Sequence, residues 1–180
     1  MVLLGRNGAG KSQFMKLITR AMTGKDIGGV SVATSLKLGA TDQEMSRLPA
    51  SGTPFDFIAS FGEGDQRSKS LLAGAGFPIE KQGRPIAQLS FGQRARLSLL
   101  ALRLSAPNFY LLDEPTNHVD ITGQERLEAE ILEHEATTIL VSHDRSLVRN
   151  IGTRFFEIVR GKLVEVDSPD PFFLSQSGAG

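Results

Sequence analysis

The sequence predicts an α/β fold with a mostly parallel sheet core and a small helical subdomain inserted into it. Three observations carry this prediction. A glycine-rich segment lies between a short apolar run and a stretch of helical periodicity, which is typical of a strand, a loop and a helix in succession. Two further apolar runs, Phe109–Leu112 and Thr137–Val141, are typical of buried strands and end in polar residues. Residues 45–88 change to short helical pieces broken by Gly and Pro.

Length and composition suit one globular domain. The chain has 180 residues, 40% of them hydrophobic and 22% charged, which is enough to bury a core. We expect a single domain over 1–174, with the α/β core in 1–44 and 89–174 and the helical subdomain in 45–88. Residues 175–180 are expected to be a disordered tail.

Composition also excludes several classes of protein. The 20 basic and 20 acidic residues give a net charge of +0, and no basic patch points to nucleic acid. Without cysteine there is no disulfide framework or thiolate metal site, which is compatible with a reducing compartment. The longest apolar stretch, Leu97–Leu104, contains Arg103 and is too short to span a membrane. Met1–Leu4 is too short for a signal peptide.

The glycine-rich segment Gly5–Ser12, GRNGAGKS, fits the pattern G-x-x-x-x-G-K-[ST] in full. Its glycines let the backbone adopt positive φ and approach a ligand, while consecutive N–H groups form an anion nest at a helix N-terminus. Lys11 supplies a charge for the β- and γ-phosphates, and the Ser12 hydroxyl is a Mg²⁺ ligand in this type of loop. The alternative is a glycine-rich turn that binds no nucleotide.

The residues after this loop predict one helix and two short strands. The helix spans about Lys11–Met22, with Phe14, Leu17, Ile18 and Ala21 on its inner face and Gly24 at its end. Val30–Val32 and Leu36–Leu38 are strand candidates, and the second runs into the polar residues 41–44. Gln43 lies among them and is unremarkable unless a Mg²⁺–phosphate site is close by.

Within the predicted subdomain, Thr53 and Pro54 begin a short helix that ends at Ala59, and a second helix spans Asp65–Ala73. The alternative is a merely long connection. After it, Leu89–Gln93, LSFGQ, opens a helix over Arg94–Leu104 with Ser90 as its N-cap. Amides at that N-terminus could bind a second anion, although LSFGQ alone is equally typical of a capped helix start.

The stretch Phe109–Asp120 reads FYLLDEPTNHVD and combines a buried strand with two adjacent acids. Pro115 ends the strand because it has no N–H for the ladder. Asp113 and Glu114 therefore lie at the carboxyl end of a strand, where open α/β sheets bind ligands. Solvated acids at a strand end are the alternative.

The remaining residues predict a helix, a further strand and a hairpin. Residues 121–135 form an acidic helix with Leu127, Ile131 and Leu132 on its inner face. The strand Thr137–Val141 ends in Ser142-His143-Asp144, which puts His143 where a ligand-facing group would lie. Residues 155–159 and 163–166 flank a hairpin turn.

Five elements now stand in order: GRNGAGKS, Gln43, LSFGQ, LLDEPTNHVD and VSHD. Together they closely resemble the ATP-binding cassette (ABC) ATPases, which are P-loop NTPases. Ser90 precedes Asp113 by 23 positions and His143 follows it by 30, which makes the resemblance specific over nearly the whole chain. The stretch PTNHVD is most similar to the ABC-F group, whose hallmark reads PTNHLD. Three departures are mild: Val119 replaces leucine, Phe91 replaces the first glycine of LSGGQ, and Gln13 stands where threonine is frequent.

The resemblance implies a role for each motif. ATP would be bound by Gly5, Asn7, Gly8, Ala9, Gly10, Lys11, Ser12 and Gln13. Mg²⁺ would be held by Ser12 and Asp113, with Gln43 as a further ligand that senses it. Glu114 would be the general base for the attacking water and His143 would contact the γ-phosphate. The residues that would meet the ATP of a facing cassette are Ser90, Phe91, Gly92, Gln93 and Asp120.

The resemblance implies an ATPase with ATP and Mg²⁺ as cofactors, active when paired with a second cassette of the same longer chain or of a homodimer. Family cassettes begin with antiparallel strands and an aromatic residue that stacks on adenine, whereas the loop here starts at Gly5. We therefore expect a fragment, most similar to the second cassette of a soluble, cytoplasmic ABC-F protein. Association with the ribosome or its RNA rests on the resemblance alone.

Three other functions are alternatives to an ABC-F ATPase. The chain could be the nucleotide-binding subunit of a membrane transporter, which an apolar docking groove on the helical subdomain would favour. It could also be an inactive or ATP-gated cassette remnant. A DNA-repair ATPase of the coiled-coil type is disfavoured because no coiled-coil insertion interrupts the chain.

Overall fold

The computed structural model of the chain describes residues 1–41, 45, 48–117, 119, 121–133 and 136–177. Among these residues the strands form one six-stranded sheet in the order β2-β3-β4-β1-β5-β6. The strands are β1 (Val2–Leu4), β2 (Leu38–Thr41), β3 (Phe109–Asp113), β4 (Thr137–Val141), β5 (Phe155–Val159) and β6 (Lys162–Val166). The first five pair in parallel and β6 pairs antiparallel with β5, which confirms the predicted α/β fold.

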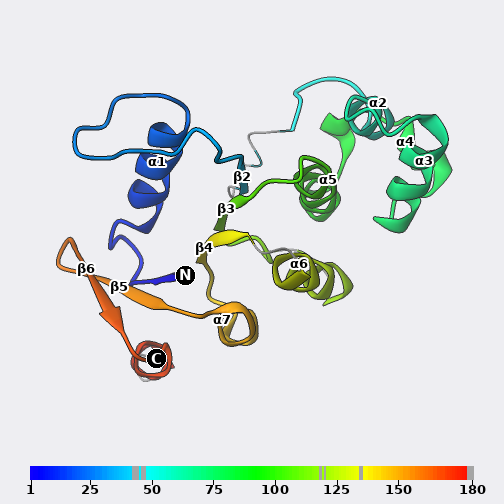
Figure 1. Cartoon of the computed structure of the whole chain (residues 1–180). Coiled ribbons are helices and arrows are strands. Elements are labelled where there is room, and N and C mark those ends of the chain that lie inside the picture. The colour runs from blue at the N-terminus through cyan, green and yellow to red at the C-terminus, as the bar shows by residue number, and fades with distance from the viewer. Residues whose placement is uncertain (42–44, 46–47, 118, 120, 134–135, 178–180) are drawn as a thin grey trace.

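Helices cover both faces of the sheet (Figure 1). In the described part of the chain they are α1 (Lys11–Met22), α2 (Pro54–Ala59), α3 (Asp65–Gly74), α4 (Ile79–Gln82), the 3-10 helix η1 (Ile86–Gln88), α5 (Phe91–Leu104), α6 (Ile121–Glu133), α7 (Arg145–Ile151) and α8 (Asp170–Ser177). Helix α1 lies on one face, and α5, α6, α7 and α8 lie on the other. No helix in the described ranges is long and apolar enough to cross a membrane.

The strands are apolar on both faces because each face has its own core. Leu3 and Leu111 pack with Met15 of α1 on one side of the sheet. Their neighbours in sequence point to the other side, where Leu4 and Leu112 pack against α6, α7 and α8. Full burial of a leucine side chain stabilises a fold by about 1.5–3 kcal/mol. Two such layers fix the carboxyl ends of β1, β3 and β4, which are neighbours in the sheet.

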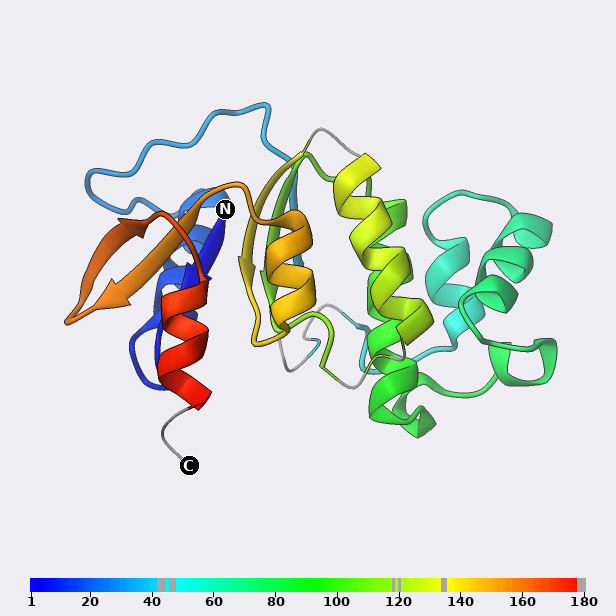
Figure 2. The same cartoon turned by 90° about the horizontal axis from the view of Figure 1, so that it is seen from below.

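Helices α2, α3 and α4 form one end of the molecule, beyond α5 and α6, while the β5–β6 hairpin lies at the opposite end (Figure 2). These helices have a core of their own, in which Ile58, Leu72 and Phe77 pack against Leu97 of α5. The predicted start of α2 is confirmed, since Thr53 and Asp56 form a capping box and Pro54 follows at N1. The division into 1–44, 45–88 and 89–174 stays a prediction.

Several predicted elements differ from the structure. Val30–Val32 is not a strand: it follows a turn at Gly29, pairs with no strand of the described residues, and leaves Val30 41% exposed. The strand expected at Leu36–Leu38 instead starts at Leu38, where pairing with β3 begins. Helix α4 and η1 were not predicted, since pieces of three or four residues carry too little periodicity.

Two predicted helix faces were partly wrong. Leu17 of α1 and Leu132 of α6 were assigned to inner faces but are 40% and 60% exposed. Met15 is buried in place of Leu17, because the sheet lies against a slightly rotated stripe of α1. Helix α8 continues to Ser177, so residues 175–177 are helical and not part of a disordered tail. Residues 178–180 lie outside the described part of the chain.

Candidate functional site

The glycine-rich loop connects the central strand β1 to α1. Gly8 and Gly10 have φ of 80° and 106°, a backbone region that only glycine enters without strain. Gly10 is the N-cap of α1 and provides no side-chain hydrogen bond to the first turn. The orphan amides of that turn therefore need an external acceptor, and a phosphate group at a helix N-terminus is a suitable one.

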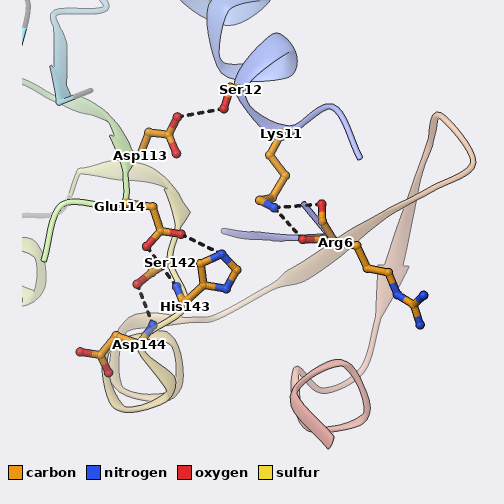
Figure 3. A network of polar contacts seen from close by, with 9 residues as sticks. Arg6, Lys11, Ser12, Asp113, Glu114, Ser142, His143 and Asp144 are labelled. Carbon is orange, nitrogen blue, oxygen red and sulfur yellow. Dashed lines mark hydrogen bonds and ion pairs between the residues drawn. The ribbon is translucent and has the colours of Figure 1, made fainter. Parts of the chain in front are cut away.

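The Lys11 ammonium folds back over this loop. Its Nζ donates to the carbonyl oxygens of Gly5, at 2.6 Å, and Arg6, at 3.2 Å. Figure 3 shows that the Arg6 side chain points away from the other site residues. Lys11 thus places a positive charge beside the loop, where a bound phosphate would meet it.

A cavity of about 470 Å³ joins the loop to the ends of two neighbouring strands. Its lining residues are Asn7, Gly8, Gly10, Lys11, Ser12, Gln13, Asp113, Glu114, Val141 and His143. The structure thus brings together residues from three of the predicted motifs. Gly5 and Ala9 belong to the same loop but do not line the cavity. Gln43 and Asp120, which were also predicted, lie outside the described residues.

Ser12 and Asp113 face each other at one side of the cavity. The Ser12 hydroxyl donates to Asp113 Oδ2 at 3.4 Å (Figure 3). Both groups are oxygen ligands of the kind that Mg²⁺ prefers. Two oxygens on one octahedral Mg²⁺ lie roughly 3.0 Å apart when adjacent and roughly 4.2 Å apart when opposite, from metal–oxygen distances of about 2.1 Å. The observed spacing therefore fits a shared Mg²⁺ with only a small adjustment.

Glu114 lies next to Asp113 but is buried, with 7% of its surface exposed. Its φ of 50° is unusual for a residue other than glycine, and its amide donates to the carbonyl of Val141 at 2.9 Å. Its Oε2 accepts a hydrogen bond from the His143 amide at 3.2 Å, and Oε1 lies 3.4 Å from His143 Nε2. Oε1 accepts no hydrogen bond from the described residues, and its contact with the imidazole is an ion pair only when that ring is protonated.

Burial raises the pKa of the Glu114 carboxyl above its ordinary value of 4.5. The His143 imidazole when protonated, the His143 backbone amide and the Lys11 ammonium oppose this rise in pKa, and the neighbouring carboxylate of Asp113 adds to it. A carboxyl with a raised pKa accepts a proton more readily than an exposed one, which suits a general base near neutral pH. Groups of this kind cluster at functional sites.

Two residues that sequence reasoning did not assign to the site hold the backbone around His143. The Ser142 hydroxyl, which is buried, accepts from the Asp144 amide at 3.0 Å. Asp144 is the N-cap of α7 and accepts from the amides of Ser146 and Leu147. The imidazole extends from this cap beside Glu114 and is 54% exposed (Figure 3). An Asp directly before a helix is an N-cap signal that could have identified this support.

LSFGQ lies at the start of α5, and none of Ser90, Phe91, Gly92 and Gln93 lines the cavity. Ser90 caps α5 as predicted, and it forms a capping box with Gln93: the Ser90 amide donates to Gln93 Oε1 at 2.9 Å, and the Gln93 amide donates to Ser90 Oγ at 3.3 Å. Phe91 is 39% exposed. Contact of these residues with a facing ATP stays a prediction.

A phosphate-binding loop after the central strand, with carboxylates at the neighbouring strand end, defines a P-loop nucleotide-binding domain. The family model described as "ABC transporter" matches residues 1–117. The chain therefore belongs to the ATP-binding cassette family, and at the level of the family the prediction of an ATPase cassette is confirmed.

Three curated relatives match most of the chain. YdiF of Bacillus subtilis (strain 168), named for ATP binding, is 33% identical over 165 residues, covering 91% of this chain and 26% of that protein. YheS of Escherichia coli (strain K12), also named for ATP binding, is 37% identical over 151 residues, covering 82% and 24%. The ribosome protection protein VmlR of Bacillus subtilis (strain 168) is 32% identical over 146 residues, covering 81% and 26%. These relatives agree with the resemblance to the ABC-F group, and the chain spans about a quarter of their length.

Solved structures match the fold. One is titled a dimeric structure of a post-hydrolysis state of the ATP-binding cassette MJ0796 bound to ADP and Pi. It superimposes with a TM-score of 0.69 at 21% identity, covering 92% of this chain and 83% of that one. At this identity the likeness shows the fold alone.

Proposed function

We propose that this cassette binds ATP with Mg²⁺ and hydrolyses it to ADP and phosphate. The observation that carries the proposal is the shared cavity, in which the glycine-rich loop meets Asp113, Glu114 and His143. Phosphoryl transfer depends mainly on positioning and charge stabilisation, and this cavity offers amides, one ammonium and two carboxylates for those tasks.

Each residue has a proposed task. The loop amides and Lys11 bind the phosphates, and Ser12 and Asp113 hold Mg²⁺ with Gln43. When bound, Mg²⁺ neutralises phosphate charge. Glu114, which lines the cavity, accepts a proton from the attacking water. His143 lies beside Glu114, with Nε2 3.4 Å from Oε1, and also lines the cavity, where it contacts the γ-phosphate.

The direct experiment measures phosphate release by the full-length protein that carries this cassette. We expect release that requires Mg²⁺, stops on addition of EDTA and returns when Mg²⁺ is restored. Absence of phosphate release, together with retained ATP binding, would favour the ATP-gated remnant over an active enzyme. Absence of both would contradict nucleotide binding itself.

We further propose that hydrolysis requires a second cassette facing this one, in the same longer chain or in a homodimer. The residues Ser90–Gln93 support this because they lie outside the cassette's own cavity and carry the exposed Phe91. The MJ0796 cassette, whose structure is described as dimeric, agrees with such a pairing. If the facing cassette comes from a homodimer, phosphate release per cassette should rise with protein concentration as the dimer forms, and light scattering would follow that assembly. If it lies in the same chain, phosphate release per cassette should not depend on protein concentration, and removal of the second cassette should lower it.

For the whole protein we propose an ABC-F factor that acts on the ribosome in the cytoplasm. The name of VmlR, a ribosome protection protein, supports this, as does the similarity of PTNHVD to the ABC-F hallmark. The test is sedimentation of the ATP-trapped protein with ribosomes. A protein that stays in the ribosome-free fraction under these conditions would contradict the ribosomal role.

One observation favours the alternative of a transporter subunit. A groove of about 560 Å³ lies between the helical subdomain and helices α5 and α6, lined in part by Leu71, Leu99 and Leu127. Such a groove could receive a helix of a membrane partner. Recovery of the protein in the membrane fraction, released by detergent and not by salt, would support this alternative.

A further inference from the structure

One side chain, Gln124, holds the loop that follows Glu114. Gln124 lies in the first turn of α6, and its Nε2 donates to the carbonyl oxygens of Thr116, at 3.4 Å, and Val119, at 3.3 Å. Both N–H groups of one amide thus bind the same loop. The loop also contains two turns, in which the Asn117 amide donates to the Glu114 carbonyl at 3.2 Å and the Val119 amide to the Thr116 carbonyl at 3.1 Å.

The carbonyl groups that Gln124 binds belong to buried residues. Thr116 is 6% exposed and Val119 is 8% exposed. A carbonyl shielded from water needs a protein donor. The Thr116 carbonyl also accepts from the Val119 amide, whereas Gln124 is the donor shown for the Val119 carbonyl among the described residues. Gln124 thus links the two turns of the loop to the first turn of α6.

This loop begins directly after the buried carboxylate. Glu114 has a left-handed backbone conformation, which persists only where the surroundings over-determine it. On one side, Glu114 is fixed by its bond to Val141 and by the His143 amide. On the other side, Glu114 is followed by the loop that Gln124 binds, and its carbonyl accepts from the Asn117 amide.

We propose that Gln124 is a positioning residue for ATP hydrolysis, which acts by fixing the loop between Glu114 and α6 and thereby the orientation of the Glu114 carboxylate. The inference rests on the proposed function of Glu114 as the general base. Gln124 itself does not line the nucleotide cavity, so its loss should change kcat while the affinity for ATP stays the same.

Gln124→Met is the test variant, because methionine has a similar length and no hydrogen-bond donor. In the full-length protein we expect kcat to fall at least about fivefold, because even a small displacement of a catalytic group lowers the reaction rate strongly. The KM for ATP should stay within about twofold. Gln124→Lys restores a donor and should recover at least half of the lost kcat. Glu125→Gln changes an exposed neighbour on the same helix turn and is the matched control.

A second measurement does not depend on hydrolysis. Hydrogen exchange at the amides of Asn117 and Val119 should accelerate roughly fivefold in Gln124→Met, because the loop loses two hydrogen bonds. Exchange of the β3 and β4 amides should not change. A uniform loss of protection with a lower Tm would show that Gln124 supports the whole domain, and this would overturn a positioning role.

The outcomes separate the two claims. If the wild-type protein hydrolyses ATP and Gln124→Met matches its kcat, the Gln124 inference is wrong and the proposed function stands. If the wild-type protein binds but does not hydrolyse ATP, the proposed function fails, and unchanged exchange at Asn117 and Val119 would then overturn the Gln124 inference as well.

Discussion

The backbone amide of His143 donates to Glu114 Oε2 at 3.2 Å, although 29 positions separate the two residues. The bond joins the carboxyl ends of β3 and β4, which pair in parallel from Phe109 with Thr137 to Asp113 with Val141. The bond fixes a buried carboxylate that lines the cavity, beside the imidazole of the same histidine.

The first prediction concerns the pH dependence of hydrolysis. Burial raises the pKa of Glu114 above 4.5, and a general base acts only when it is deprotonated. As the pH falls, kcat/KM, which reports the groups of the free enzyme, should therefore decline through the raised pKa, at a pH above that expected for an exposed glutamate. Single-turnover rates at subsaturating ATP from pH 5 to 8 would show this acid limb. A rate that stays flat down to the ordinary pKa of glutamate would contradict it.

The second prediction concerns stability. Above its raised pKa, Glu114 is ionised in the folded state, and burial makes this charge unfavourable relative to the unfolded chain. In the pH range between 4.5 and the raised pKa, the folded state binds more protons, so wild-type stability falls as the pH rises through that range. Glu114→Gln removes the charge, and its amide oxygen can still accept from His143.

The Tm of Glu114→Gln should therefore exceed that of the wild type at neutral pH. The difference should shrink as the pH is lowered through the raised pKa towards 4.5. Glu128→Gln, on α6 and away from the cavity, is the control. If Glu114→Gln is less stable than the wild type at neutral pH, the carboxylate is not in the desolvated environment described above.

The third prediction concerns the ammonium in the loop. Lys11→Met should weaken ATP binding on the order of 10- to 100-fold, the usual worth of a hydrogen bond to a charged group. Equilibrium dialysis with labelled ATP would measure the loss. Lys16→Met, which alters an exposed lysine of the same helix, should bind ATP like the wild type. Equal effects of both substitutions would indicate a nonspecific loss of positive charge.

The fourth prediction tests the packing that supports the sheet edge. A Cβ atom added at Gly39 of β2 would lie 2.5 Å from Cγ of Pro107 and 2.7 Å from Cδ1 of Leu102. Gly39→Ala should therefore lower the free energy of unfolding by about 1–3 kcal/mol through overpacking. A Cβ atom added at Gly74, at the end of α3, would have no neighbour within 4 Å. Gly74→Ala should therefore leave the free energy of unfolding unchanged or raise it slightly. Urea unfolding of the two variants gives the comparison.

Much of the α/β core could be predicted because its signals are local. The glycine pattern, the apolar runs of β3 and β4 and the caps at Thr53 and Ser90 each determine structure within a few residues. The cavity could be anticipated for the same reason, since strand ends in a parallel sheet meet at one edge.

Other features depend on contacts between distant segments. The burial of Met15 instead of Leu17 depends on how α1 is rotated against the sheet. Val30–Val32 has a strand-like sequence but pairs with no strand of the described residues, and a local pattern cannot show whether a partner strand is present. The bond from Gln124 to the loop at Thr116 likewise arises from the direction in which α6 leaves that loop. These contacts join segments that are distant in sequence, so local sequence patterns do not predict them.

The central claim is that Glu114 activates the water that attacks ATP. The most direct test compares phosphate release by the wild-type protein and by Glu114→Gln, both in the full-length protein and at saturating ATP and Mg²⁺. We predict that the substitution lowers the rate on the order of 10²- to 10⁴-fold while ATP binding is retained. Equal rates of phosphate release in the two proteins would contradict the claim.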